Sequence, residues 1–543
     1  MTDSGAGRRA GSATRRSAIV VLVAMAAAAS CAGPGGGTEA DDRSWEDGAA
    51  DGWSRWTSEQ GMRAWDEDED AAFSQWIGRL GEARAAGECS TLASCLASER
   101  ANALWEEEDQ HFSVYADCAD LPYVLRAYFA YKRRLPFSFV SDISGGRYTS
   151  GNRVAAHEDW RDYGSLPSLL RAISEEVHSG FYRIAPEVED GDHFPIEITR
   201  EHVRPGTIYY DPNGHVLLVY AVDDNGTVRL MDGHPDNSLT VQRFGEKFAR
   251  GNAAQGGGFR NWRHQRLEGD RVVRASNGDR RRTPGFSTEQ YASSFTAAGN
   301  TVGFHEWVRF RLSANGGRRQ AVEEYEEIVQ GLCGDIQDRL HAVDTAVASG
   351  VHRRAHPAEL PSNIYGTTGE WETYSTPSRD ARLKAAFREL HRYVLATVEA
   401  VENGDESVFE FQGSVEDLLG RYREIWDQYA ESDCAIAYDD SRGRPVELDL
   451  NDVMDRLFDL SFDPYHCPEL RWGADPDDPE MADELASCPD SAEKLRWYRD
   501  EYRLRNRIDR DYDSRTTLDF GPEEPEDIHV PRLLDRLAAE RGF

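Results

Sequence analysis

The chain has 543 residues and a formal net charge of −35 at pH 7, because 97 aspartates and glutamates outweigh 62 lysines and arginines. This acidic composition argues against a nucleic-acid-binding protein, since contacts to phosphate depend on Lys and Arg. The length exceeds what one hydrophobic core normally covers, so more than one folding unit is expected.

Residues 1–31 have the pattern of an export leader. Four arginines precede an apolar stretch, residues 18–29, that is too short for an ordinary membrane span and ends at Ser30-Cys31. Small residues before a cysteine resemble a bacterial lipobox, which implies cleavage before Cys31 and its lipidation. The alternative is a plain secretory signal with an incidental cysteine. Both predict an exported cell-envelope protein, and the lipid would anchor it to a membrane, facing the periplasm or the surface, without spanning it.

Composition and periodicity divide the rest of the chain. Residues 32–60 are rich in Gly, Asp and Glu, which predicts a flexible acidic tether, and residues 61–110 show helical spacing. Residues 111–265 mix helix and strand patterns, whereas residues 266–317 are polar and predict a linker or long loop. Residues 318–543 are expected to form a mainly helical accessory region.

Two polar stretches have ordinary explanations. Asp66–Asp70 lacks the glycine and spacing of a calcium-binding loop, so a solvated acidic run is expected. His157, Glu158 and Asp159 have side chains that can bind metals, but a loop position is favoured.

Cys118 stands at the expected start of a buried helix. Two capping schemes fit: Asp117 caps with Asp120 as its reciprocal partner, or Asp120 caps with Pro122 in the first turn. The second scheme suits the proline better. Both leave Cys118 near the positive end of the helix dipole, and such a position favours the thiolate form, which is the nucleophilic one.

Two consecutive hairpins bring a histidine to one end of a sheet. Asp211-Pro-Asn-Gly214 predicts a turn, after which His215 opens an apolar strand. Asp224-Asn-Gly226 predicts a second, tight turn, and the returning strand ends at Asp232. Because the open ends of a hairpin are neighbours, His215 should lie beside the stretch from Asp232 to His234, where a group that orients an imidazole belongs.

These motifs resemble the NlpC-type and CHAP-type papain-like cysteine amidases. The resemblance rests on an Asp-Cys pair at a helix start, on Pro205-Gly-Thr207, and on Gly214-His-Val216 at a strand start. It covers residues 111–265 and implies an α+β fold with a helix-borne cysteine and an antiparallel sheet. Thr207 replaces the usual aspartate of its turn, and residues 135–203 form a long insertion before it.

The resemblance implies a catalytic role for each member of the constellation. Cys118 would be the nucleophile, His215 the base, and Asp232, or alternatively His234, the residue that orients the base. A transglutaminase-like interpretation also selects Asp232. The default donor to a developing oxyanion is the backbone N–H of Cys118. Each residue alone has a structural explanation, and only the joint pattern predicts a site.

The cysteine count is compatible with a free catalytic thiol. Eight cysteines are present, and if Cys31 is lipidated and Cys118 catalytic, six remain for disulfides in an exported protein. Cys89–Cys95 and Cys467–Cys488 are the preferred local pairs and leave Cys333–Cys434, although six cysteines allow fifteen pairings. No pair has zinc-finger spacing, so a structural zinc is not expected. The sequence predicts no metal site and no cofactor.

The sequence therefore predicts an exported lipoprotein whose papain-like domain cleaves or transfers an amide bond. The resemblance implies a peptide or peptidoglycan-like substrate in the cell envelope, with the lipid as the membrane contact. The alternative is a non-catalytic envelope lipoprotein whose helical half binds a protein or a glycan. Transglutaminase-like acyl transfer is a second alternative.

Overall fold

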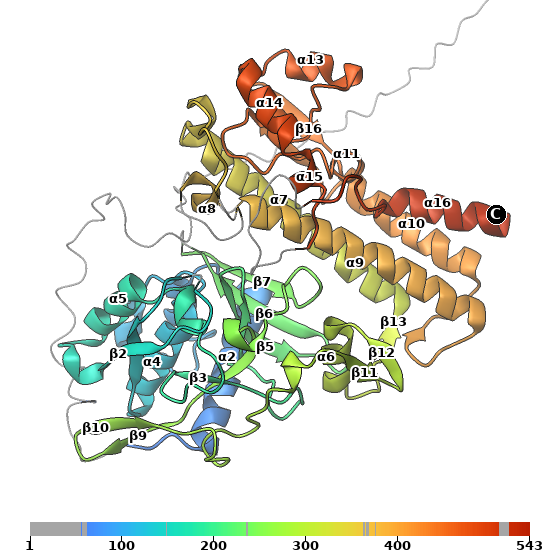
Figure 1. Ribbon diagram of the computed structural model, residues 1–543. Coiled ribbons are helices and arrows are strands. Elements are labelled where there is room, and N and C mark those ends of the chain that lie inside the picture. The colour runs from blue at the N-terminus through green and yellow to red at the C-terminus, as the bar shows by residue number, and fades with distance from the viewer. Residues whose placement is uncertain are drawn as a thin grey trace, which may run out of the picture.

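The computed structural model describes residue 56 and residues 62–147, 149–234, 237–361, 364, 369–374, 376–509 and 521–543. The expected leader with Cys31, and all of the expected tether except Trp56, lie outside the described residues. Two lobes are visible in Figure 1. The sheet lobe comprises residues 62–312 and the helical lobe residues 321–543, within the described ranges. Helix and strand together place the chain in the α+β class, as predicted.

One antiparallel sheet organises the sheet lobe. Its strands are β3 (His193–Pro195), β4 (Ile208–Asp211), β5 (His215–Val222), β6 (Val228–Gly233), β7 (Leu239–Arg243) and β8 (Gly258–Trp262). They lie in the order β3-β8-β4-β5-β6-β7. The helices of this lobe are α2 (Glu67–Ala85), α3 (Leu92–Leu96), α4 (Leu121–Arg133), α5 (Leu166–Glu176) and α6 (Phe304–Leu312).

Both faces of the sheet are apolar, and helices cover each of them. On β5, Val216 and Leu218 belong to the core shared with α2 and α4, whereas Leu217 and Val219 belong to the core shared with α6. Successive side chains of a strand point to opposite faces, so one strand supplies both cores. Since α2 shares the first of these cores, the helical segment 61–110 is part of the sheet lobe.

The long insertion, residues 135–203, contributes to both cores: its residues from Leu135 to Tyr182 pack on the α4 side of the sheet, and those from Phe194 to Val203 pack on the α6 side. It contains strands β1 (Ser138–Ile143) and β2 (Val154–Asp159), which pair as an antiparallel hairpin, then α5 and β3. Residues 157–159 are therefore in a strand and not in the expected loop.

Residues 266–317 are not an extended linker. They include most of the hairpin β9 (Gln265–Glu268) with β10 (Arg271–Arg274), the hairpin β11 (Phe295–Ala297) with β12 (Asn300–Val302), and α6. Phe304, Trp307, Val308 and Leu312 of α6 are buried on the sheet. Four apolar residues at helical spacing are enough to anchor α6, although the segment as a whole is polar.

The acidic run before and in α2 is not fully solvated, contrary to the expectation. Asp66 caps α2 by accepting a hydrogen bond from the N–H of Glu69 (2.9 Å). Asp70 is buried, and its carboxylate lies 2.9 Å from Arg126 of α4 and 2.6 Å from His264. Asp66 is an exposed helix cap, whereas Asp70, one helical turn later, is in a buried ion pair. Composition alone does not distinguish these two roles.

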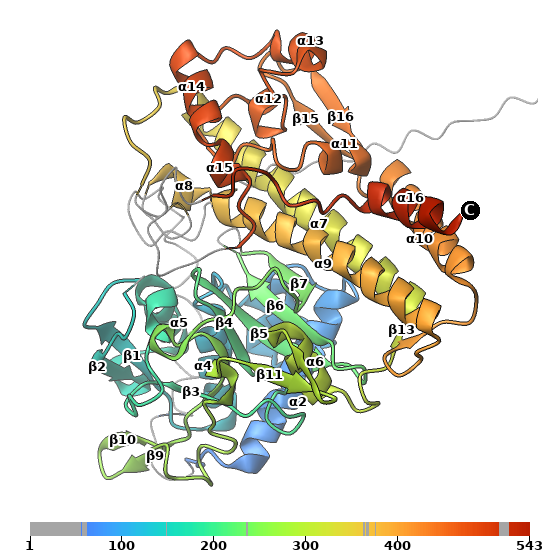
Figure 2. The same cartoon turned by 45° about the vertical axis from the view of Figure 1, so that its right-hand side comes forward.

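The helical lobe is built on two long helices, α7 (Ala321–Ala348) and α9 (Thr376–Asn403), which lie side by side (Figures 1 and 2). Helices α10 (Val415–Glu431) and α16 (Val530–Arg541) pack with them around a separate apolar core. Strands β13 (Arg319–Gln320) and β14 (Phe409–Glu410), and the pair β15 (Ile436–Asp439) and β16 (Pro445–Leu448), complete this part. No helix in the described part of the chain is long and apolar enough to cross a membrane.

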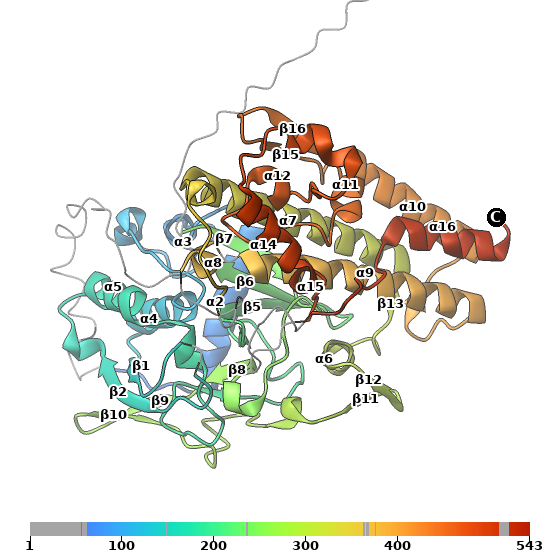
Figure 3. The same ribbon diagram turned by 45° about the horizontal axis from the view of Figure 1, so that its top comes forward.

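A tail of short helices lies beside the end of α7 and α8 (Glu370–Thr373), as Figure 3 shows from above. The tail contains α11 (Leu450–Asp455), α12 (Pro468–Arg471), α13 (Ala482–Leu485), α14 (Ala492–Asp500) and α15 (Tyr502–Arg505). Disulfides join Cys89–Cys95, Cys333–Cys434 and Cys467–Cys488, which confirms the preferred pairing. Cys118 takes part in none of these disulfides.

The two lobes meet through charged side chains. Arg243 of β7 lies 2.9 Å from Glu324 of α7, and Lys247 lies 2.8 Å from Asp335 of the same helix. In Figures 1 and 2, α9 passes over the end of the sheet that carries β6 and β7. The helical lobe therefore covers one end of the sheet through polar contacts, while its own apolar core remains separate.

Candidate functional site

Cys118 lies in the turn that leads into α4. The Asp117 carboxylate accepts hydrogen bonds from the N–H groups of Ala119 (2.8 Å) and Asp120 (3.2 Å). The N–H of Asp117 donates to the carboxylate of Asp120 (3.3 Å), which itself makes no capping bond. Each scheme is therefore right in part: Asp120 holds the N-cap position with Pro122 in the first turn, as in the second scheme, but the side-chain bonds are the reciprocal Asp117–Asp120 bonds of the first.

The cysteine turn is held in place by two neighbouring elements. The hydroxyl of Tyr182 donates a hydrogen bond to the carbonyl oxygen of Ala119 (2.7 Å). Gly233, the last residue of β6, packs against the chain just before Cys118: a Cβ there would lie only 2.8 Å from the carbonyl oxygen of Ala116. Only glycine permits this close approach of β6 to the turn.

The predicted turn between β4 and β5 is present. The N–H of Gly214 donates to the carbonyl oxygen of Asp211 (3.0 Å), and the carboxylate of Asp211 accepts from the N–H of Asn213 (2.9 Å). Gly214 has φ of +92°, a left-handed conformation that a three-residue hairpin loop requires and that glycine adopts without strain. His215, paired with Asp211, therefore begins β5 at the rim of the sheet.

The second hairpin brings Asp232 to the same rim. Nε2 of His215 lies 3.0 Å from Oδ2 of Asp232, and Nε2 of His234 lies 3.5 Å from the same oxygen. Oδ1 of Asp232 accepts hydrogen bonds from Thr240 (2.5 Å) and Gln242 (3.1 Å) of β7. The arrangement of neighbours is the one that the hairpin argument predicts, with both histidines beside one carboxylate.

Burial and contact set the protonation of this group. Burial lowers the pKa of His215 below its ordinary value, an effect that the contact with Asp232 only partly offsets and that the positive charge of Arg382 increases. Burial raises the pKa of Asp232, but His234, His215 and Thr240 outweigh it and leave that pKa well below its usual range. At neutral pH the group is a neutral imidazole beside a carboxylate, which is the form that can accept a proton.

The sulfur of Cys118 lies at the same end of the sheet but on its other side. Sγ is 4.0 Å from the carbonyl oxygen of Gly214, the residue before His215. The alternation along β5 places His215 in register with Leu217 and Val219, on the α6 face, whereas Cys118 leads into α4 on the opposite face. The structure therefore joins His215 to Asp232 directly and brings Cys118 to the backbone beside the histidine.

The site is largely covered. Cys118 is 2% exposed, and the side chain of His215 is 14% exposed. Arg382, on α9, acts electrostatically on His215, so the helical lobe contributes a charge to the site. A cavity of about 440 Å³ lies between the lobes, behind Asp232: Thr240 and Gln242 line one side and residues of α7 and α9 the other. Neither Cys118 nor His215 lines it.

Sequence reasoning missed three contributors to the site. Thr240 and Gln242 have no motif of their own, and only the pairing of Asp232 with Thr240 on β7 identifies them. A predicted third hairpin after Asp232 could have identified them, because Thr240 and Gln242 are alternate residues of the next strand and so share the face of Asp232. Arg382 was visible only as part of an amphipathic helix, and its position depends on how the two lobes pack.

No family model, no curated protein and no solved structure matches this chain.

Proposed function

We propose that the protein is an exported cysteine hydrolase with a papain-like domain that cleaves an amide bond in a cell-envelope peptide. The observation that carries the proposal is the convergence of three separate segments at one rim of the sheet. The thiol of Cys118 stands at the start of α4, 4.0 Å from the Gly214 carbonyl, and His215 follows, 3.0 Å from Asp232. A thiol, an imidazole and a carboxylate at one place are the parts of a nucleophilic site.

The reaction follows from the chemistry of these groups. His215 takes the proton of the Cys118 thiol, and the thiolate adds to the amide carbonyl carbon. The C–N bond then breaks as the imidazolium returns the proton to the leaving amine. Water, deprotonated by His215, next attacks the thioester, which releases the carboxylic acid and restores the thiol. The N–H of Cys118 is the default donor to the oxyanion formed in each addition.

Asp232 orients the base in this scheme. Its Oδ2 faces Nε2 of His215, so that Nε2 holds a proton and Nδ1 is the nitrogen that exchanges a proton with sulfur. Thr240 and Gln242 hold the other oxygen of the carboxylate in place. His234, 3.5 Å from the same carboxylate, is the alternative third residue and lies farther from it than His215 does.

The geometry makes two demands on the reaction. Because His215 and Cys118 approach the rim from opposite faces, proton transfer requires a side-chain rotation or one bridging water past Gly214. Because Cys118 is 2% exposed, a substrate reaches it only after a covering segment moves. The helical lobe, which lies over this end of the sheet and supplies Arg382, is the element proposed to control access.

The low exposure of Cys118 also favours a second candidate, a non-catalytic envelope protein whose helical lobe binds a partner. Transglutaminase-like transfer would use the same thioester with an amine in place of water. In each case the proposed location is the envelope, with Cys31 lipidated. Mass measurement of membrane-extracted protein, and release of a Cys31→Ala variant into the soluble fraction, would test the anchor.

A thiol-reactive amide probe tests the enzyme directly. The folded protein should be labelled at Cys118, and His215→Ala should slow labelling strongly while circular dichroism remains native. Hydrolysis of peptidoglycan stem peptides should be lost in Cys118→Ser. Asp223→Asn, at the far end of the same hairpin, also removes a carboxylate from an ion pair, here with Arg229 (2.7 Å); it is the matched control and should keep wild-type activity. An unlabelled Cys118 in folded protein, with no effect of His215→Ala, would leave the binding alternative.

A further inference from the structure

A second buried polar cluster lies in the helical lobe, remote from the cysteine. It consists of His356, Asp463 and Glu501, each of which offers one ligand atom within 4.8 Å of the other two. The three residues are buried, and the side chains of His356 and Asp463 are fully shielded from solvent. A histidine and two carboxylates without water around them require a counterion, a shared proton or a metal ion.

The orientation of His356 is that of a metal ligand. Its Nδ1 lies 2.6 Å from the carbonyl oxygen of Pro357, and since a carbonyl can only accept, Nδ1 carries the proton. Nε2, 2.8 Å from Oδ2 of Asp463, therefore presents a lone pair to another lone pair in the neutral ring. A second ring proton, which makes an imidazolium–carboxylate ion pair, or a cation between the two atoms removes this repulsion. A ligating histidine usually donates its other N–H to a carbonyl or carboxylate in this way.

Glu501 provides the independent observation. Glu501 is fully buried between α14 and α15, and its carboxylate oxygens accept no hydrogen bond from the described residues. It faces the Asp463 carboxylate, to which it can bond only if one of the two carries a proton. Nδ1 of His466 lies 4.0 Å from Oε2 but is bonded to Ser461. Of the guanidinium groups near it, Arg505 donates to the carbonyl oxygens of Phe458 and Tyr498, and Nε of Arg471 donates to that of Ser461. Nη2 of Arg471 has no hydrogen-bond partner among the described residues, so it does not satisfy Glu501 either. A buried carboxylate without a donor is costly unless something binds it.

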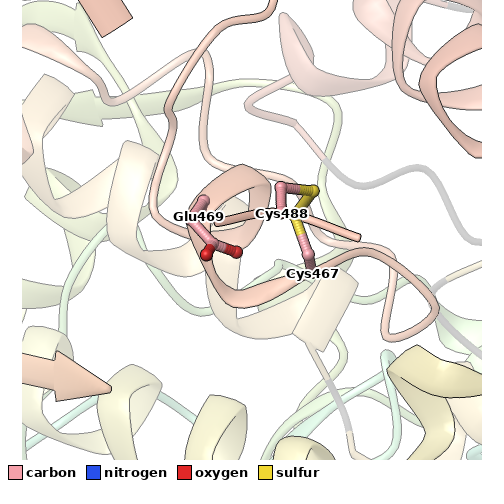
Figure 4. A group of neighbouring side chains, drawn as sticks. All are labelled: Cys467, Glu469 and Cys488. Carbon is pink, nitrogen blue, oxygen red and sulfur yellow. A yellow bond between two sulfur atoms is a disulfide. The ribbon is translucent and has the colours of Figure 1, made fainter. Parts of the chain in front are cut away.

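A neighbouring cluster provides a comparison, because its ligand atoms all have partners within the protein. Cys467, Glu469 and Cys488 also lie close together, but the two sulfurs form a disulfide (Figure 4). Glu469 accepts hydrogen bonds from the N–H and hydroxyl of Ser441 and from the hydroxyl of Ser487. Every ligand atom there is occupied, so this cluster has no need of a cation.

We propose that His356, Asp463 and Glu501 bind one divalent transition-metal ion, with zinc as the best fit. One imidazole nitrogen and two carboxylate oxygens form a borderline donor set that suits Zn²⁺ better than Ca²⁺ or Mg²⁺, which prefer oxygen alone. With bonds of about 2.0–2.2 Å, two zinc ligands lie roughly 3–4 Å apart, so small side-chain shifts close the site. The fourth position is available to water or to the second oxygen of Glu501.

The ion would act as a structural staple. It joins the loop after α7, the loop before α12 and the junction of α14 with α15, which are far apart in the sequence. These segments contain little regular structure, and a small polar tail gains stability from covalent or metal links. The Cys467–Cys488 disulfide links the start of α12 to the segment before α14, whereas the loop after α7 takes part in no disulfide among the described residues. His356 stacks on Trp497, with ring centroids 4.5 Å apart, which keeps the site dry. The proposal is independent of the cysteine site.

The test is metal binding to the full chain. After treatment with a chelator and equilibrium dialysis against Zn²⁺ with millimolar Mg²⁺ present, elemental analysis should find one zinc per chain. Glu501→Gln and His356→Gln should weaken binding by more than the roughly 10–100-fold loss typical of outer-shell changes. Glu469→Gln, a buried carboxylate with partners of its own, is the matched control and should keep wild-type binding. Zinc should also raise the melting temperature of wild type but not of Glu501→Gln.

Two further readouts keep the test decisive. If the variants fail to fold, Co²⁺-loaded wild type should show the visible absorption of a low-coordination site, which loosely bound surface ions do not. Folded wild type that retains no Zn²⁺ and no Mn²⁺ would overturn the proposal and leave a proton shared between the carboxylates. Unchanged zinc binding by folded Glu501→Gln would place the ion elsewhere on this acidic surface.

Discussion

Each lobe contains a largely covered histidine beside a buried aspartate, but the two pairs are assembled differently. In the sheet lobe, His215, Asp232 and Thr240 come from three successive strands, and Oδ1 of Asp232 already has two donors. In the helical lobe, His356 and Glu501 are 145 residues apart (501 − 356), and Glu501 has no donor among the described residues. Oδ2 of Asp232 likewise has no hydrogen-bond partner among the described residues, but only Glu501 lacks a partner for both oxygens. The difference teaches that a group built from adjacent hairpins supplies more of its own donors than one built from distant segments.

The most severe test of the sheet-lobe pair is Asp232→Asn. If the proposed function holds, the amide cannot fix the tautomer of His215, and kcat should fall by as much as about 10⁴-fold. The measurement is hydrolysis of the peptide that wild type cleaves, with Asp223→Asn as the control. A loss near tenfold would instead mean that Asp232 has a structural role, and His234→Gln would then be the next variant to assay.

Removing a disulfide from each lobe allows the resulting losses of unfolding free energy to be compared. Cys333–Cys434 closes a sequence separation of 101 residues in the helical lobe, and Cys89–Cys95 closes one of 6 in the sheet lobe. Replacing both cysteines by alanine should cost about 4–5 kcal/mol for the first pair and about 2 kcal/mol for the second, because longer loops lose more chain entropy on cross-linking.

Urea unfolding without reductant measures these losses, and hydrogen exchange read by mass spectrometry assigns each loss to a lobe. Since the two lobes have separate cores, the loss of Cys333–Cys434 should increase exchange in α7 and α10 and leave β4–β6 protected. Equal losses for the two pairs, or exchange that rises in both lobes together, would mean that the lobes unfold as one unit.

Local features of this molecule were predictable from the sequence. Two of these features depend on residues close in sequence: the turn at Gly214 and the pairing of His215 with the end of the next strand. The three disulfides followed from the number and spacing of the cysteines. Even there, one detail was only partly right: Asp120 holds the N-cap position, but the side-chain bonds at the cysteine turn come from Asp117, because the carboxylate of Asp120 accepts from the N–H of Asp117.

Long-range features were not predictable. Asp70 looked like part of a solvated acidic run, since nothing in the local pattern reveals that Arg126 and His264 come to it. The anchoring of α6 and the grouping of His356 with Glu501 likewise depend on tertiary packing, which overrides composition. A buried charge is recognisable only when its partner is known.

The ion pair of Asp70 with Arg126 tests whether a buried charge depends on its partner. Asp70→Asn should destabilise the sheet lobe by about 3 kcal/mol, because it leaves the buried guanidinium of Arg126 without a full countercharge. Glu67→Gln, an exposed change in the same acidic run, should alter stability by less than about 0.5 kcal/mol. Urea midpoints of the two variants separate the buried from the solvated part of the run. Equal, small effects would restore the solvated interpretation.

The smallest predicted effect is a pH dependence caused by His215. Because burial keeps its folded pKa below the ordinary value of 6.5, the unfolded chain gains a proton first as the pH falls. Stability from this residue is therefore complete above that value and is lost as the pH decreases through it. The difference in unfolding free energy between wild type and His215→Gln should shrink between about pH 7.5 and about pH 5.5.

Other buried histidines with lowered pKa values, such as His193, destabilise both proteins equally and cancel in this difference. A difference that grows as the pH falls would mean that His215 is charged when folded, held by Asp232 as an ion pair. That result would mean that His215 is not a neutral base. His215 and His356 would then be alike in needing a positive charge beside their aspartates, a ring proton for His215 and a metal ion for His356.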